Sequence, residues 1–234
     1  IVLVQITPAV RSAWGEELGI PRDEATVERL ACALRRVGFE YVFDTDFSAD
    51  LTIMEEGSEF LERFTHKKDY RWPMFTSCCP GWVRFLKSQY PERTEELSTA
   101  KSPQQMFGAT MKTWYAKKLN MDPSKMVVVG VMPCTAKKFE TKRDGEAASG
   151  YPDVDISITT RELARMIESA GIYFKHLPDE EFDNPFGEST GAATIFGATG
   201  GVMEAALRTA VKLITGAEAP SPEFNDVRGM KNIK

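Results

Sequence analysis

Short β-branched runs alternate with amphipathic helical patterns along this chain, and that alternation is the strongest constraint on its fold. Strands that alternate with helices pack as a mainly parallel sheet with helices on its faces. The predicted strands cover residues 1–6, 41–44, 73–77, 125–132 and 155–159. The sequence therefore predicts an α/β protein built on twisted, mainly parallel sheets.

The order of the predicted strands indicates two lobes. Residues 1–124 hold three strands, and the run at 125–132 is expected to begin a second sheet within residues 125–234. Only the strand at 155–159 follows it, and a sheet of two strands is not stable on its own. The second lobe is therefore expected to be incomplete in this sequence.

The predicted helices carry clear start and stop signals. Residues 25–37 place apolar side chains on one face, and a glycine follows as a stop. Thr159 and Glu162 have the spacing of a capping box. A glycine-rich turn at 197–201 leads into a helix expected over about 201–215, and close backbone packing explains those glycines better than a nucleotide site.

Composition excludes several classes of function. The chain has 234 residues, 42% of them hydrophobic, and a net charge of −5, which argues against a nucleic-acid face or a polybasic membrane patch. No apolar run approaches the roughly 20 residues that span a bilayer, so a soluble protein is expected. The sequence begins at Ile1 without an initiator Met, so its start is expected to have been trimmed, and any targeting segment would precede it.

Three of the four cysteines, Cys78, Cys79 and Cys134, follow predicted strands and precede turns. Ligands bind at the carboxyl ends of strands in open α/β sheets, and so few cysteines favour reduced thiols with metal or redox chemistry. Neighbouring residues in an extended segment point to opposite sides, so one sulfur of the adjacent pair is predicted to bind a metal while the other faces a separate cavity. A four-thiolate zinc site, which would lack the usual CxxC spacing, and two ordinary half-buried thiols are the alternatives. Cys32 fits a buried position on a helix.

Glu56, Glu59 and Arg63 recur at i, i+3 and i+7, which is one stripe of a helix. Such a stripe is usually a solvated face. If it is buried beside the cysteine turn, its carboxyl groups become candidates for a proton relay, with pKa values raised by desolvation. Lys137 lies three residues after Cys134, so its ammonium either reaches an anionic ligand on the cysteine side or lies on the surface.

With these motifs in view, the sequence resembles the catalytic domain of the FeFe-hydrogenases. The segments that carry the resemblance are TSCCPGW, IMEEGSEF, LSTAKSPQQMFG, MPCTAKKFE, ITTRELARMI and GAATIFGATGGVMEAALR. The resemblance covers essentially all 234 residues, and the two cysteine motifs are highly specific. It implies two lobes with the active site in the cleft between them.

The resemblance also implies an H-cluster, in which a cysteine sulfur bridges a four-iron four-sulfur cubane to a di-iron subcluster. Carbon monoxide, cyanide and a bridging dithiolate are the ligands of that subcluster. Cys79 and Cys134 match ligands of the cubane, and Cys78 matches the thiol that exchanges protons beside the di-iron subcluster. Lys137 resembles the residue that pairs with a cyanide.

The proton path implied by the resemblance runs from Cys78 through Glu56 and Ser98 to Glu59, with Arg63 at its outer end. The stripe on the helix then has a use that a solvated face does not give it. The other residues that match the lining of the di-iron pocket are Pro8, Ser102, Gln104, Met132 and Phe196.

The implied activity is the reversible reduction of protons to dihydrogen, with electrons exchanged with ferredoxin or with accessory iron–sulfur domains or subunits. Maturation proteins would build the H-cluster. A cytoplasmic location is expected, and a periplasmic one stays open. The family's other two cubane cysteines are absent from these residues, and Cys32 matches no ligand motif, so this stretch alone is expected to be inactive.

Two non-enzymatic alternatives share the resemblance. The hydrogenase-like iron–sulfur assembly factors of eukaryotes have no di-iron unit, and sensory homologues use the cluster to report hydrogen to a signalling partner. The assembly factors generally lack the first cysteine of the pair, so Cys78 beside Glu56 and Glu59 favours the enzyme. The complete path favours turnover over sensing.

Overall fold

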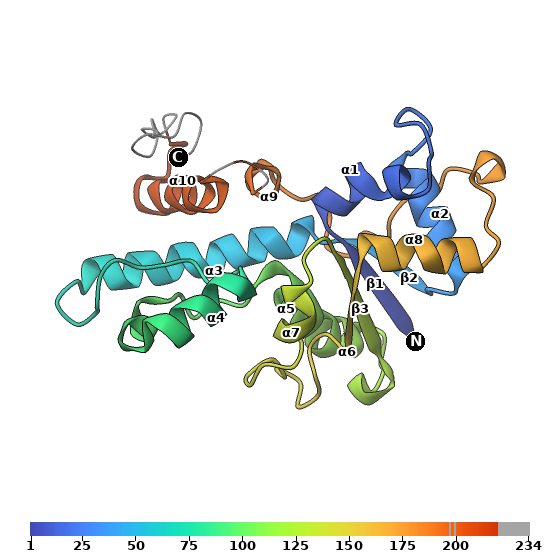
Figure 1. Ribbon diagram of the computed structural model, residues 1–234. Helices are drawn as coiled ribbons and strands as arrows, with labels where there is room; N and C mark the ends of the chain where they lie inside the picture. Colours follow the sequence, from blue (N-terminus) through green and yellow to red (C-terminus); the bar gives the residue numbers. More distant parts are fainter. Residues whose placement is uncertain (197, 199, 220–234) are drawn as a thin grey trace. The chain divides into compact units, whose positions relative to one another are not determined.

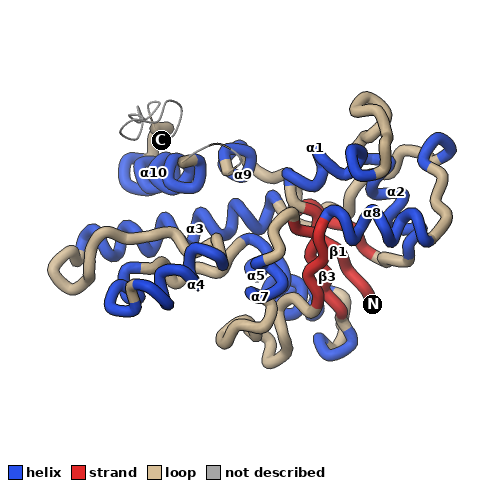
Figure 2. The backbone as a smooth tube through the Cα atoms, in the orientation of Figure 1, coloured by secondary structure: helices blue, strands red, loops and turns tan. Residues whose placement is uncertain are grey.

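The structure is a computed structural model that describes residues 1–196, 198 and 200–219 (Figure 1). It confirms the predicted α/β class, because a parallel sheet is flanked by helices. In the described part of the chain, the sheet has four strands in the order β2-β1-β3-β4. Figure 2 draws them in red, with bounds of Val2–Ile6 for β1, Tyr41–Asp44 for β2, Val127–Met132 for β3 and Ile156–Thr159 for β4.

The chain forms two compact units, each made of two separate stretches of sequence. The first unit contains Ile1–Thr45 and Gln104–Glu188, and the second contains Asp46–Pro103 and Ser189–Lys234. All four strands belong to the first unit. The units do not coincide with the predicted lobes 1–124 and 125–234, and that lobe boundary stays a prediction.

An apolar core of the first unit joins the sheet to three of its helices, α1 (Pro8–Glu17), α2 (Val27–Val37) and α8 (Thr160–Ser169). The other helices are α5 (Pro103–Thr110), α6 (Ala116–Lys118) and α7 (Ala136–Glu140), with a π-helical stretch at Met111–Tyr115. Val4, Val42 and Val131 from three strands pack in this core with Leu30 and Cys32 of α2. The prediction that Cys32 is a buried helix residue is confirmed.

The expected second sheet is wrong, because β3 pairs with β1. The two strands run parallel, from Val2 opposite Val127 to Ile6 opposite Val131. Nearly every residue of β3 is buried, which suits a strand with neighbours on both edges and helices on both faces. The run beginning near residue 125 therefore completes the first sheet.

The second unit is helical in its described part. Its helices are α3 (Asp46–Thr65), α4 (Pro80–Gln89), α9 (Gly191–Ile195) and α10 (Gly201–Thr215), with a short 3-10 helix at Pro91–Glu96. Both α9 and α10 pack against α3. The helix predicted over 201–215 is confirmed, whereas Gly197 and Thr199 of the turn before it lie outside the described residues.

The strand predicted at 73–77 is wrong. Among the described residues its backbone pairing is one isolated bridge, in which Phe75 N donates to Glu96 O at 2.8 Å and Ser98 N donates to Phe75 O at 2.7 Å. Pro73 has no amide hydrogen to extend that pairing. The apolar run is therefore an extended connection that leads to the adjacent cysteines.

The capping box is confirmed at the start of α8. The Glu162 amide donates to Thr159 Oγ1 at 3.2 Å, and Thr159 N donates to Glu162 Oε2 at 2.8 Å.

None of the helices in the described residues is long and apolar enough to cross a membrane.

A buried ion pair fixes the π-helical stretch to the sheet of the first unit. The Lys112 ammonium donates to Asp155 Oδ1 at 2.8 Å and Oδ2 at 2.7 Å, and to the carbonyl oxygen of Pro152 at 2.6 Å. Asp155 Oδ2 also accepts from Val128 N of β3 at 2.7 Å. The Lys112 side chain is only 1% exposed, so the pair replaces its lost hydration.

Asp155→Ala should destabilise the first unit by about 3 kcal/mol, because it leaves a buried ammonium without its counter-ion. Urea denaturation of the full-length apoprotein measures this loss. Asp23→Ala removes an exposed aspartate of the same unit and should change stability by less than about 0.5 kcal/mol. Equal effects of the two substitutions would contradict the role of the pair.

Candidate functional site

The adjacent cysteines lie in the second unit, where an extended segment meets α4. Cys79 is the N-cap of α4, with extended backbone angles, and its Sγ accepts a hydrogen bond from Trp82 N at 3.4 Å. Pro80 occupies the first helical position, where no amide donor is needed. The Cys79 side chain is exposed and Cys78 is half-buried, so both sulfurs are accessible to different degrees.

Glu56 of α3 is the most deeply buried carboxyl group among the described residues of this unit. The residue is 1% exposed, and its Oε1 accepts from Ser77 N, the amide just before the cysteine pair, at 3.4 Å. Its Oε2 is buried without a hydrogen-bond partner among the described residues. A solvated face is therefore wrong for this part of the stripe.

The environment of Glu56 favours its protonated form. Desolvation by burial raises the pKa of Glu56 to about 7, and the charge of Glu59 adds to the rise. The amide of Ser77 and the hydroxyl of Ser98 act in the opposite direction, since they stabilise the carboxylate. Burial outweighs both, so Glu56 exchanges a proton near neutral pH.

Glu59, Ser98 and Arg63 form a connected hydrogen-bond chain next to Glu56. Ser98 Oγ donates to Glu59 Oε2 at 2.7 Å, and Arg63 Nε and Nη2 donate to Glu59 Oε1 at 3.0 and 2.6 Å. Arg63 is 4% exposed, and its Nη2 also donates to the carbonyl oxygen of Leu97 at 2.8 Å. The structure therefore brings four residues of the predicted path together within one unit.

The first unit carries the other cysteine motif. Cys134 is exposed on the turn after β3, and its carbonyl oxygen accepts from Lys137 N at 3.2 Å as α7 begins. The Lys137 side chain is 13% exposed, and its Nζ lies 3.1 Å from each carboxylate oxygen of Glu140. A freely solvated lysine is therefore wrong for this position.

The remaining predicted residues are distributed over both units. In the first, Met132 ends β3 and is buried, Pro8 opens α1, and Gln104 of α5 is 1% exposed. In the second, Ser102 is fully buried and Phe196 is half-buried after α9. Each unit therefore contributes its own set of the predicted site residues.

Sequence reasoning missed two acidic residues that hold these elements. Glu140 is fully buried and binds both Lys137 and Gln104. Asp50 of α3 anchors the start of α9, accepting from Thr190 N at 2.6 Å, from Thr190 Oγ1 at 2.7 Å and from Ala193 N at 3.2 Å. Glu140 follows Lys137 by three residues, and this spacing was a signal for an ion pair. No pattern among the residues near Asp50 indicated its contacts with Thr190 and Ala193.

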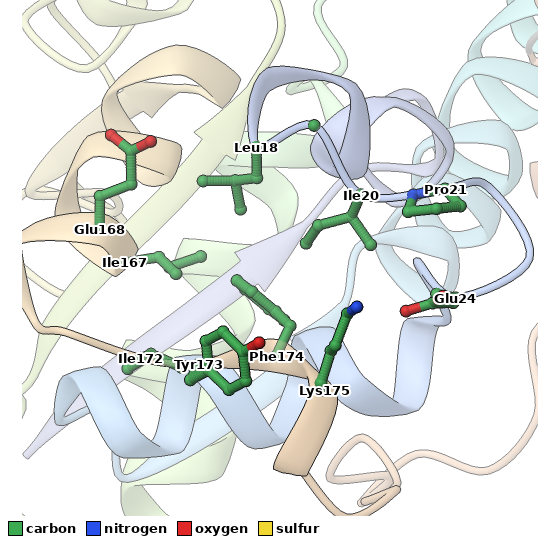
Figure 3. A pocket seen from close by; sticks show the side chains of 11 residues that line it. Leu18, Ile20, Pro21, Glu24, Ile167, Glu168, Ile172, Tyr173, Phe174 and Lys175 are labelled. Carbon is green, nitrogen blue, oxygen red and sulfur yellow. The ribbon is translucent and has the colours of Figure 1, made fainter.

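A pocket of about 290 Å³ lies elsewhere on the first unit (Figure 3). Its walls are mainly apolar, with Leu18, Ile20, Ile167 and Phe174 among them. None of the predicted site residues lines it.

Within the described residues, no three His, Cys, Asp or Glu side chains cluster as a metal site.

Comparison with known proteins decides the family. Residues 1–234 match the family described as iron-only hydrogenase large subunit, C-terminal domain. The chain belongs to the FeFe-hydrogenase family.

Individual relatives agree with this assignment. The chain is 56% identical to the NADP-reducing hydrogenase subunit HndD of Solidesulfovibrio fructosivorans, over 100% of its own length and 41% of that relative. It matches a structure of the apo FeFe-hydrogenase of Chlamydomonas reinhardtii, in a variant form, with a TM-score of 0.84 and 49% identity, over 98% of this chain and 58% of that one. A cytosolic Fe-S cluster assembly factor of Xenopus tropicalis is 29% identical, over 97% of this chain and 49% of that relative. The chain thus spans about half the length of the relatives it matches.

The FeFe-hydrogenase family implies an H-cluster with iron–sulfur cofactors, and the residues present fit such a group. Cys79 and Cys134 offer exposed sulfur donors, the ligand type that iron–sulfur clusters use. Lys137 supplies a cationic donor suited to an anionic ligand. Gln104 Oε1 is buried without a hydrogen-bond partner among the described residues, as expected of a group beside a cofactor.

Glu56 should make stability depend on pH. Its pKa is about 7 in the folded protein against an ordinary 4.5, so the folded state binds the proton more tightly than the unfolded chain. Stability should therefore fall as pH rises through this window, by up to about 3 kcal/mol, and stay level above it. Urea denaturation of the full-length apoprotein at about pH 5 and about pH 8 measures the loss.

Glu56→Gln removes this ionisation and should flatten that part of the pH profile. Glu55→Gln changes the exposed neighbour on the same helix and should leave the profile as in the wild type. A Glu56→Gln profile that matches the wild type would show that Glu56 titrates in its ordinary range.

Proposed function

We propose that this chain is part of the catalytic domain of a hydrogenase that reversibly reduces protons to dihydrogen. The observation that carries the proposal is the buried Glu56, which has one carboxylate oxygen without a partner among the described residues and lies at the amide before the adjacent cysteines. A buried, proton-exchanging carboxyl group is expensive to maintain, and it suits the delivery of protons to a site shielded from water.

The proposed cofactor ligands are two of the exposed thiols. Cys79 and Cys134 would bind the four-iron four-sulfur cubane, and the remaining cubane ligands would come from residues outside this sequence. Cys32 is excluded because it is fully buried in the core around α2. Residues 1–234 alone are therefore expected to be inactive.

The proposed lining of the di-iron subcluster is formed by neutral and cationic side chains. Lys137 would hold a cyanide by a charge-assisted hydrogen bond, which fixes that group without a protein–iron bond. Carbon monoxide, cyanide and the bridging dithiolate would be enclosed by Pro8, Ser102, Gln104, Met132 and Phe196. When bound, the H-cluster supplies the iron chemistry and electron storage for interconverting protons and dihydrogen.

The protein's part in this chemistry is to move a proton. The Cys78 thiol would exchange it with Glu56, whose pKa of about 7 lets the carboxyl group accept and release a proton near neutral pH. The Ser98 hydroxyl already donates to Glu59 at 2.7 Å, so on receiving a proton from Glu56 it would release its own to Glu59. Arg63 holds Glu59 through two N–H donors and keeps that acceptor in place.

The proposed partners follow from the electron balance. Each dihydrogen needs two electrons, which would pass through the cubane from ferredoxin or from accessory iron–sulfur domains or subunits. Maturation proteins would supply the di-iron subcluster. The cytoplasmic location expected from the sequence stays a prediction.

A non-catalytic iron–sulfur protein is the second candidate, because an assembly factor aligns with 97% of this chain. Its identity of 29% is well below the 56% of the hydrogenase subunit. Cys78 and the buried Glu56 favour the enzyme, since cluster assembly and hydrogen sensing without turnover have less use for a proton path.

Cys78→Ala in the complete protein should lower hydrogen evolution at least roughly a hundredfold, because the first proton carrier is lost. Iron content and the infrared bands of the carbon monoxide and cyanide ligands should stay. Cys32→Ala removes a thiol from the core and should leave activity unchanged. Activity of Cys78→Ala within a few-fold of wild type would overturn the relay.

Cys134→Ala should lose iron from the cubane, because a thiolate ligand is removed. Iron analysis and the visible absorption of the reconstituted complete protein measure the loss, again with Cys32→Ala as the control. Full iron content in Cys134→Ala would remove Cys134 from the ligand set.

A further inference from the structure

Glu140 is the last residue of α7 and is fully buried. Its carboxylate accepts hydrogen bonds from the Lys137 ammonium. Its two oxygens lie 3.1 Å from Lys137 Nζ, and its Oε2 also accepts from Gln104 Nε2 at 3.0 Å. Lys137 and Gln104 are both proposed to line the di-iron subcluster. One acidic side chain therefore connects two elements of that lining within the first unit.

The contact with Glu140 determines the orientation of the Gln104 amide. Gln104 Nε2 donates to Glu140 Oε2 and to the carbonyl oxygen of Lys137, at 3.0 and 3.3 Å, which uses both of its hydrogens. A reversed amide would place its oxygen against a carboxylate and a carbonyl. Oε1 is therefore turned away from Glu140, where it is buried without a hydrogen-bond partner among the described residues.

The backbone makes room for this orientation. A Cβ atom at Gly130 of β3 would lie 2.6 Å from Gln104 Oε1, so a larger residue there would displace the amide oxygen. Glycine at this point lets Gln104 approach the central strand pair. The amide is thus held from one side by Glu140 and accommodated on the other by Gly130.

The same carboxylate sets the charge and direction of the Lys137 ammonium. The Lys137 side chain is 13% exposed and the Glu140 side chain is fully buried, so both charged groups lose hydration on folding. Each charge therefore offsets part of the hydration that the other has lost.

We infer that Glu140 is a positioning residue of the hydrogen-evolving site, which holds the Lys137 ammonium and the Gln104 amide in the orientations they present to the di-iron subcluster. The inference rests on the proposed function, because it takes Lys137 and Gln104 as lining residues. Partners of this kind, one layer behind the groups that touch a metal centre, typically change affinity or activity roughly ten- to a hundredfold when replaced.

The chain offers a matched control in Glu146. It pairs with Arg143 at the same i,i+3 spacing in the same unit, and its side chain is 4% exposed. A Glu-to-Gln change at either position removes one buried carboxylate from a short-range ion pair. In the described hydrogen bonds the Glu146 carboxylate accepts from Arg143, whereas the Glu140 carboxylate accepts from Lys137 and Gln104, which are proposed to line the cofactor.

The test compares Glu140→Gln and Glu146→Gln in the complete, cofactor-loaded protein. Glu140→Gln should shift the infrared cyanide stretching bands at unchanged iron content and lower hydrogen evolution roughly tenfold. Glu146→Gln should leave the bands where they are in the wild type. A loaded Glu140→Gln protein with wild-type bands would overturn the inference.

If Glu140→Gln does not give a folded, loaded protein, Glu140→Asp decides the matter. This substitution keeps the charge and shortens the side chain. The cyanide bands should therefore shift by a measurable amount that is smaller than the shift caused by losing the carboxylate. Unmoved bands in Glu140→Asp would overturn the inference. Failure of the proposed function is separate, since it would appear as a complete wild-type protein without these bands and without hydrogen evolution.

Discussion

The parallel pairing of β1 with β3 is the constraint on which the candidate site in the first unit depends. It aligns Ile6 with Val131, so the turns that follow both strands start from the same edge of the sheet. One turn leads to Pro8 at the start of α1, and the other leads to Cys134 and α7. Parallel strands end on the same side, so residues more than a hundred positions apart share one end of the fold.

Three cations with little exposure are each paired with a carboxylate in this protein. Lys112 is held by Asp155, Lys137 by Glu140 and Arg63 by Glu59. In each case the cation is at most 13% exposed. Such pairs add little net stability over apolar packing, yet breaking one is costly, so they favour a single arrangement of the groups around them.

Patterns among neighbouring residues were enough to predict several of the helices and strands. The strand at Tyr41–Asp44, the helix at Gly201–Thr215 and the capping box at Thr159 were all predictable from neighbouring residues. The 73–77 run was apolar enough for a strand, but within the part of the chain that the structure describes it pairs only through the single bridge at Phe75. Strand partners and the burial of Glu56 and Glu140 depend on residues far away in sequence, which no local pattern contains.

The hydrogen bonds of Asp50 have a consequence for the order in which the protein can mature. They join α3 to Thr190, 140 residues later, so the second unit closes only after the intervening stretch Gln104–Glu188 of the first unit has been translated. Until α9 and α10 emerge from the ribosome, the face of α3 that packs against them has no partner. Such late, long-range closure is slow compared with local helix formation. Closure of the second unit therefore has to follow the synthesis of α9 and α10.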